Sequence, residues 1–135
     1  MEQQSQPTKR MWTKSTENLL FAENALKSGW CSAGMSRCYY AMRHAVLDYA
    51  AELLRRGEYT TEEYRAMSEG PHGRLLRFAS EHLPEFHRSL VVSRSRRNKA
   101  DYFLIAVTAD ERAASLADAV KIRDSIRRKL GEKHG

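Results

Sequence analysis

Four cations, an amide, a carboxylate and a phenol lie within the stretch RSRRNKADY, which runs from Arg94 to Tyr102. Arginine and lysine bind the phosphate groups of nucleic acids, and carboxylate and phenol groups can transfer protons. On a helix, however, Arg94, Arg97 and Asp101 would be neighbours on one face, where ion pairs stabilise a helix end slightly. The stretch is therefore either a site that binds phosphate or a salt-bridged helix end.

Two sets of candidate site residues follow from this stretch. The candidates for direct action on a substrate are Arg97, Asn98, Asp101 and Tyr102. The candidates for attracting nucleic acid are Arg94, Arg96, Arg97 and Lys99. The whole chain has a net charge of +6 and a pI of about 9.5, which favours RNA, DNA or an acidic protein as a partner without identifying it.

No metal or cofactor motif accompanies these residues. The five histidines show no HxxxH or HExxH spacing, and Cys31 and Cys38 form no CxxC pair. On one helix the two cysteines would lie about 10.5 Å apart, too far for a disulfide, and we expect reduced thiols in a cytoplasm. The glycine-rich motifs GxxxxGK[ST] and GxGxxG are also missing. We therefore expect neither a metal site nor a cofactor.

The elements that must position these residues are predicted to be helices. Apolar residues at three- and four-residue steps predict a helix over 12–27, ended by Gly29. A central helix over 30–56 has apolar or small residues around most of its circumference, so it should be enclosed by neighbours on several sides. Capping-box patterns at Thr60–Glu63 and Thr108–Glu111 open a short helix over 61–67 and the last helix, and another short helix covers 74–82. A further helix begins at Pro84.

Two of these helices carry predicted inward stripes. The helix from Pro84 should bury Phe86, Leu90 and Val91. The last helix, which ends at Gly131, should bury Ala113, Leu116, Ala119, Val120, Ile122 and Ile126. The segment 102–107 has the composition of a strand but no partner strand, so we expect helix or helix-like turns there.

The predicted fold is all-α, a compact up-and-down bundle of about four long helices with short connecting helices. A length of 135 residues suits one domain. We assign 1–10 to a flexible N-terminal tail, 11–131 to the helical domain and 132–135 to a C-terminal tail. Charges such as Arg37, Arg43 and Asp48 interrupt the most apolar region, so we expect no membrane contact and a cytoplasmic location.

Taken together, five segments of the sequence resemble the HEPN domain family. They are AENALKSG, AGMSRCYYAMRHAVLDYAAELLRRG, PHGRLLRFASEHL, RNKADY and TADERAASLADAVKIRDSI. Their order and spacing match over about residues 12–130, and the most specific parts are SRCYYAM at 36–42 and RNKADY at 97–102.

The resemblance implies a HEPN-like helical bundle that forms a homodimer in a prokaryote. It also implies a frequent pairing with a nucleotidyltransferase antitoxin in toxin-antitoxin or defence modules. Many members of the family are metal-independent endoribonucleases with an R-x(4-6)-H motif, for which Arg97 matches the arginine. Such cleavage needs a group that takes the ribose 2′-hydroxyl proton, a group that protonates the leaving oxygen, and cations beside the phosphate.

The chain departs from this motif at the histidine. Tyr102 stands five residues after Arg97, and no histidine occurs between Leu90 and Lys133. An unperturbed phenol with a pKa near 10 is only about 0.1% ionised at pH 7, and Asp101 is a weak base. The variant R-x-x-A-D-Y is the part of the family that the chain resembles most.

Three functional hypotheses remain open at this stage. The first is a dimeric protein that binds RNA or nucleotide in a cleft with Arg97, Asn98, Asp101 and Tyr102, and that acts as an endoribonuclease if a base is available. The second is a non-catalytic interaction module for a nucleotidyltransferase or another protein. The third is a DNA-binding protein, for which no helix-turn-helix signal is present.

Overall fold

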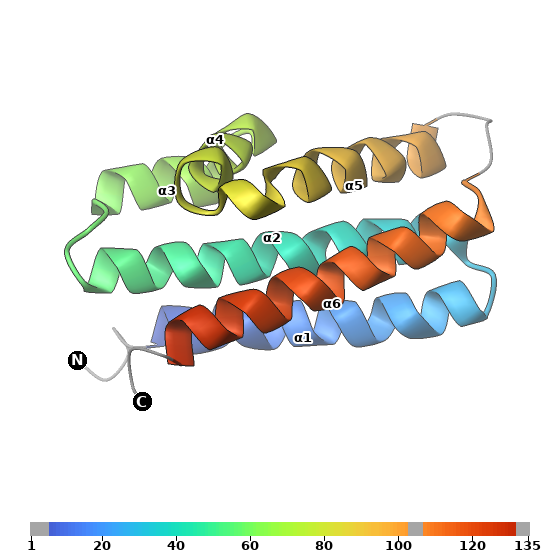
Figure 1. The fold of residues 1–135 in the computed structure, drawn as a ribbon, viewed down its shortest axis with the longest axis horizontal. Coiled ribbons are helices and arrows are strands. Elements are labelled where there is room, and N and C mark those ends of the chain that lie inside the picture. Colours follow the sequence, from blue (N-terminus) through green and yellow to red (C-terminus); the bar gives the residue numbers. More distant parts are fainter. Residues whose placement is uncertain (1–5, 103–106, 132–135) are drawn as a thin grey trace.

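The computed structural model describes residues 6–102 and 107–131, which form six helices and contain no strand. The six helices are α1 (Gln6–Lys27), α2 (Cys31–Arg55), α3 (Thr61–Glu69), α4 (His72–His82), α5 (Pro84–Tyr102) and α6 (Ala109–Gly131). The four long helices run up and down side by side, and the short α3 and α4 lie at one end of the bundle (Figure 1). The predicted all-α bundle is confirmed.

Local signals at the helix ends explain most of the boundaries. Thr60 and Glu63 form the predicted capping box of α3, with each side chain bonded to the backbone N–H of the other. At the start of α6, the N–H of Glu111 donates to Thr108 Oγ1 and the N–H of Thr108 donates to Glu111 Oε1. After α2, Gly57 has a φ of 79°, a left-handed conformation that favours glycine.

Some boundaries differ from those predicted. The first helix begins at Gln6, so part of the segment assigned to a tail is helical, and α4 begins at His72, two residues early. The helix from Pro84 continues through the whole arginine-rich stretch to Tyr102. Residues 103–106, for which helix or turns were expected, lie outside the described part.

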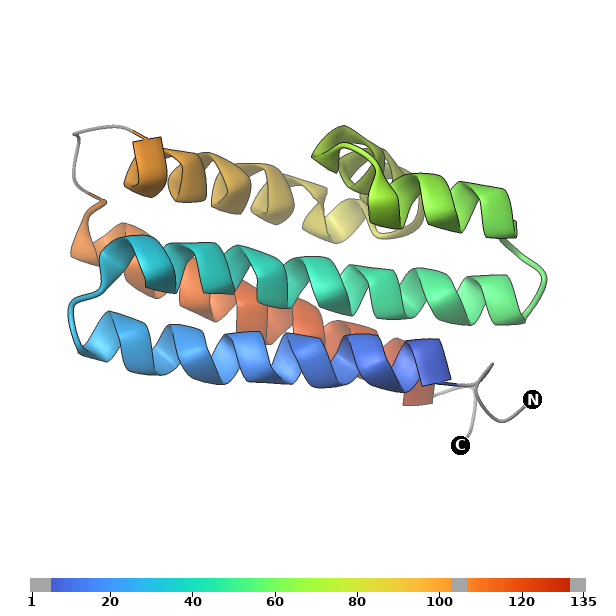
Figure 2. The same ribbon diagram turned by 180° about the vertical axis from the view of Figure 1, so that it is seen from behind.

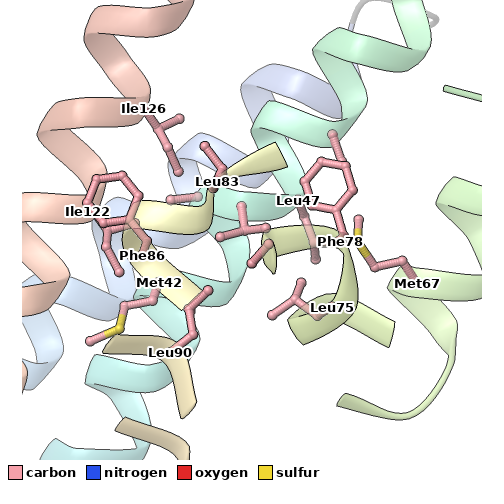
Figure 3. Close-up of a cluster of buried hydrophobic side chains, with 14 of the residues drawn as sticks. Met42, Leu47, Met67, Leu75, Phe78, Leu83, Phe86, Leu90, Ile122 and Ile126 are labelled. Carbon is pink, nitrogen blue, oxygen red and sulfur yellow. The ribbon is translucent and has the colours of Figure 1, made fainter. Parts of the chain in front are cut away.

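Helix α2 lies at the centre of the bundle, between α1 and α5 in both views (Figures 1 and 2). It carries buried residues along its length, and its Met42 and Leu47 meet side chains from α3 to α6 in one cluster (Figure 3). The small residue Gly34 lets α1 approach, because a Cβ there would collide with Leu26. The central helix is therefore enclosed by the others, as its composition predicts.

Three residues assigned to the inward stripes are exposed instead. Val91 and Val120 keep 40% and 39% of their surface accessible, and Ala113 is also exposed. On α5 the buried residues are Phe86, Leu90 and Ser93, and on α6 they are Ser115, Ala119, Ile122 and Ile126. Because these follow steps of three and four residues, Val91, Ala113 and Val120 fall outside the buried stripes, and the two serines lie inside them.

None of the described helices combines the length and the apolar character that crossing a bilayer requires.

Candidate nucleic-acid interface

The four cations of the arginine-rich stretch divide between two faces of α5. Arg96 and Lys99 turn toward α6, where Arg96 Nη1 lies 3.1 Å from Ser115 Oγ and 4.0 Å from Asp118 Oδ2. Lys99 Nζ lies 3.1 Å from Glu111 Oε1. These two candidates for binding nucleic acid are therefore engaged by carboxylates of the fold.

Arg94 and Arg97 lie near tyrosines of α2 instead. The guanidinium carbon of Arg97 lies 5.2 Å from the centre of the Tyr40 ring, within the range of a cation–π interaction. Burial raises the pKa of the Tyr39 hydroxyl, and the charges of Arg94, Arg43 and Arg97 counteract that rise. Arg94 and Arg97 thus lie beside the tyrosine pair of the SRCYYAM motif.

An open hollow lies on the surface beside Tyr40 and Arg97. It has a volume of about 630 Å³ and is lined by Phe21, Ser32, Ala33, Ser36, Arg37, Tyr40 and Arg97. Its walls come from the C-terminal part of α1, the N-terminal part of α2 and the C-terminal part of α5, which gather at one end of the bundle (Figure 1). We call these seven residues the aromatic hollow.

Two arginine–aromatic pairs form the walls of the aromatic hollow. One is Arg97 with Tyr40, and in the other the guanidinium carbon of Arg37 lies 4.9 Å from the centre of the Phe21 ring. Phe21 is exposed. Such a surface offers rings on which a nucleobase can stack and cations for the phosphates beside it.

A hydrogen-bonded chain fixes one of these arginines. Arg37 Nη1 donates to Asn18 Oδ1 at 3.0 Å, and Asn18 Nδ2 lies 3.2 Å from His44 Nδ1. Burial, together with the charge of Arg43, lowers the pKa of His44 to about 4, so the imidazole is neutral at pH 7 and accepts from Asn18.

A second polar cluster lies on another side of Tyr39. The Tyr39 hydroxyl lies 3.0 Å from His72 Nδ1, at the first residue of α4. Burial lowers the pKa of His72, and the charges of Arg94, Arg43 and Arg97 lower it further. Arg43 also donates from Nη2 to the Ser68 carbonyl oxygen at 3.0 Å.

The structure places some predicted site residues and leaves others undescribed. Arg97 lines the hollow, and Asn98 is half-buried on α5. Asp101 and Tyr102 belong to the last turn of α5, but their side chains lie outside the described part. Within the described residues, no group of three or more His, Cys, Asp or Glu side chains could hold a metal ion.

Several residues of the interface were missed by reasoning from the sequence. Phe21 looked like an ordinary part of an amphipathic helix and His72 like part of a turn, and Arg37 and Tyr40 were noted only as members of the SRCYYAM motif. The separation of Tyr39 and His72 by 33 residues leaves no local pattern. The one available signal in the sequence was that Phe21 directly follows Leu20, because a single buried stripe does not require two adjacent large apolar residues. In the structure Phe21 is exposed.

A scan against protein-family models found no match, and searches of curated proteins and of solved structures likewise found none. The resemblance to the HEPN family therefore stays a prediction that rests on the motifs themselves.

Proposed function

We propose that this chain binds single-stranded RNA or a nucleotide in the aromatic hollow, as a HEPN-like component of a prokaryotic toxin-antitoxin or defence system. The observation that supports the proposal best is the pairing of Arg37 with Phe21 and of Arg97 with Tyr40 around one open hollow. The net charge of +6 adds a general attraction to nucleic acid.

The exposed aromatic surface of the hollow favours single-stranded RNA or a nucleotide over duplex DNA as the ligand. Bases that are not paired can leave the strand and stack on aromatic rings, whereas duplex DNA is read by an element inserted in a groove. Stacking on one ring contributes about 1–3 kcal/mol per base. The aromatic hollow provides two such rings, Phe21 and Tyr40, each beside a guanidinium.

Fluorescence anisotropy with a labelled single-stranded oligoribonucleotide in EDTA tests this proposal. The wild type should bind, and Tyr40→Leu should weaken binding by about tenfold because one stacking surface is lost. Arg97→Ala should weaken binding and also reduce its dependence on salt by about one counterion, as expected for a lost phosphate contact.

Arg77→Ala is the matched control for charge. The side chain of Arg77 is 82% exposed on α4 and has only a loose contact with Glu81. Its loss removes the same formal charge without touching the hollow, so RNA affinity should change by much less than in Arg97→Ala. Absence of RNA binding by the folded wild type would refute the proposal.

The same RNA, incubated in EDTA and run on a gel, tests for nuclease activity. Cleavage that persists in EDTA and disappears in Arg97→Ala would extend the proposed function to a metal-independent endoribonuclease. The experiment needs a folded variant, which circular dichroism establishes.

A role in protein binding is the second candidate, because α6 carries an exposed apolar hollow. It is lined by Ala113, Leu116, Ala117, Val120, Lys121 and Asp124. Small and apolar residues flanked by one positive and one negative charge suit pairing with an identical surface, so a second copy of the chain is the proposed occupant. Light scattering at tens of micromolar should show a dimer that Val120→Glu disrupts.

A nucleotidyltransferase is the other partner that the resemblance implies, and added protein of that class would compete for this face.

A further inference from the structure

The cluster around His72 contains cations that the described part of the fold does not neutralise. Two other partly buried cations are paired with carboxylates, Lys99 with Glu111 and Arg56 with Glu52. Arg43 and Arg94 form no ion pair within the described residues, and the only hydrogen bond shown for Arg43 goes to a backbone carbonyl.

Both arginines are partly buried. The Nε groups of Arg43 and Arg94 are shielded from solvent and have no hydrogen-bond partner in the described part of the chain. Burying a charge without a counter-charge is costly, and electrostatic attraction to an anion is stronger where water is partly excluded. The two guanidinium groups therefore lie where an incoming anion would lower the free energy of the fold.

The start of α4 supplies further donors beside these cations. Pro71 caps α4 without any side-chain hydrogen bond, so no side chain satisfies the first N–H groups of this eleven-residue helix. Helix N-termini with free N–H groups bind phosphate.

We propose that Arg43, Arg94 and His72 form a binding site for a nucleic-acid phosphate group, with Tyr39 as the positioning residue that holds His72. The three side chains come from α2, α5 and α4, and the charges of both arginines act on the same imidazole. The hydroxyl of Tyr39 is hydrogen-bonded to His72 Nδ1, so Nε2 is the ring nitrogen that can face the anion.

This site deepens the proposed function and rests on it for the identity of the ligand. Tyr39 and Tyr40 are adjacent, with ring centres 5.8 Å apart, so the site and the aromatic hollow lie on neighbouring faces of α2. A base stacked on Tyr40 would then have its phosphate directed toward Arg94 and His72. The phosphate could be a terminal phosphomonoester or a phosphodiester within the strand.

NMR of the full chain, titrated with inorganic phosphate at pH 7, tests the site directly. A bound phosphate dianion stabilises the imidazolium form, so the pKa of His72 should rise with phosphate and stay unchanged with chloride at the same ionic strength. The groups facing His72 are Tyr39 and Arg43 of α2 and Arg94 and Arg97 of α5. The spectrum of His72→Gln assigns the signal.

Variants separate binding from structural support. Arg94→Gln should weaken phosphate affinity by about tenfold, because it removes a charge-assisted hydrogen bond. Arg77→Gln, which changes an exposed side chain of α4, should leave the affinity unchanged. If Arg94→Gln does not fold, Arg43→Gln takes its place, and the wild-type titration decides the question without any variant. An unchanged His72 signal in tens of millimolar phosphate would overturn the site.

RNA titrations then distinguish this inference from the proposed function. A 5′-phosphorylated oligoribonucleotide that shifts His72 more strongly than its 5′-hydroxyl form identifies a terminal phosphate, and equal shifts identify a phosphodiester. RNA binding that leaves His72 unchanged refutes the phosphate site and keeps the aromatic hollow. A phosphate effect on His72 without RNA binding refutes the proposed function and keeps the site.

Discussion

Replacement of Asp48 by asparagine should stabilise the protein at neutral pH and above. Asp48 lies on α2 with 1% of its surface exposed, and its Oδ1 has no hydrogen-bond partner in the described part of the chain. Burial, and after it the nearby charge of Glu52, raises the pKa of Asp48 to about 7, although a hydrogen bond from the Trp12 backbone acts in the opposite direction. The folded protein therefore holds a proton that the unfolded chain releases.

The sign and size of the effect follow from these two pKa values. Between the ordinary value of 3.8 and about 7, the folded state binds more protons than the unfolded state, so Asp48 makes stability fall as the pH rises. Well below pH 3.8 the carboxyl is protonated in both states and costs nothing. Above pH 7 the loss reaches its full size, about 4 kcal/mol at 1.36 kcal/mol for each pH unit of difference. Asparagine mimics the protonated carboxyl and avoids this loss.

Urea unfolding of the wild type and of Asp48→Asn, measured from pH 4 to pH 8.5, tests the reasoning. The free energies of unfolding should differ little at pH 4, diverge in favour of the variant as the pH rises, and stay apart by a constant amount above about pH 7. Glu58→Gln, at an exposed position after α2, is the control for a change in net charge. A difference between wild type and Asp48→Asn that is the same at every pH would show that the carboxyl is not held protonated.

Three further substitutions or reactions test other parts of the structure. Asn18→Ala should lower the free energy of unfolding by about 1–3 kcal/mol, measured in urea at pH 7, because it removes the side-chain amide that contacts both His44 and Arg37. Thr108→Ala should cost about 1 kcal/mol through loss of the cap on α6, and an unchanged melting temperature would contradict the cap. Burial raises the pKa of Cys38 to about 12, so a thiol reagent at pH 8 should label Cys31 in the native protein and Cys38 only on unfolding; fast labelling of two thiols would contradict this.

The helices could be predicted from the sequence because their signals are local. Capping boxes at Thr60 and Thr108 and the glycine after α2 act within a few residues, and their outcome depends little on the rest of the chain. The inward stripes were predicted less well. Val91 and Val120 are apolar but exposed, because the direction in which a helix faces depends on the neighbours that pack against it.

The candidate site shows the same limit more clearly. Helical spacing alone separates Arg94 and Arg97 from Arg96 and Lys99, since residues three apart share a face and residues two apart do not. The sequence cannot show which pair meets which neighbour. In the structure, Glu111 and Asp118 of α6 neutralise one pair.

The other pair lies beside α2, where Arg97 packs over the Tyr40 ring and the charge of Arg94 acts on Tyr39. A tyrosine ring attracts a guanidinium group without neutralising it.

The rotation of α5 about its axis decides which of its cations meet the α6 carboxylates and which lie beside the α2 tyrosines. A rotation by half a turn would bury Arg94 and Arg97 against the α6 carboxylates and would leave Arg96 and Lys99 facing the tyrosines. The buried stripe of Phe86, Leu90 and Ser93 prevents that rotation, because it fixes the inward face of α5. Packing at one end of this helix therefore selects which cations at the other end face the α2 tyrosines.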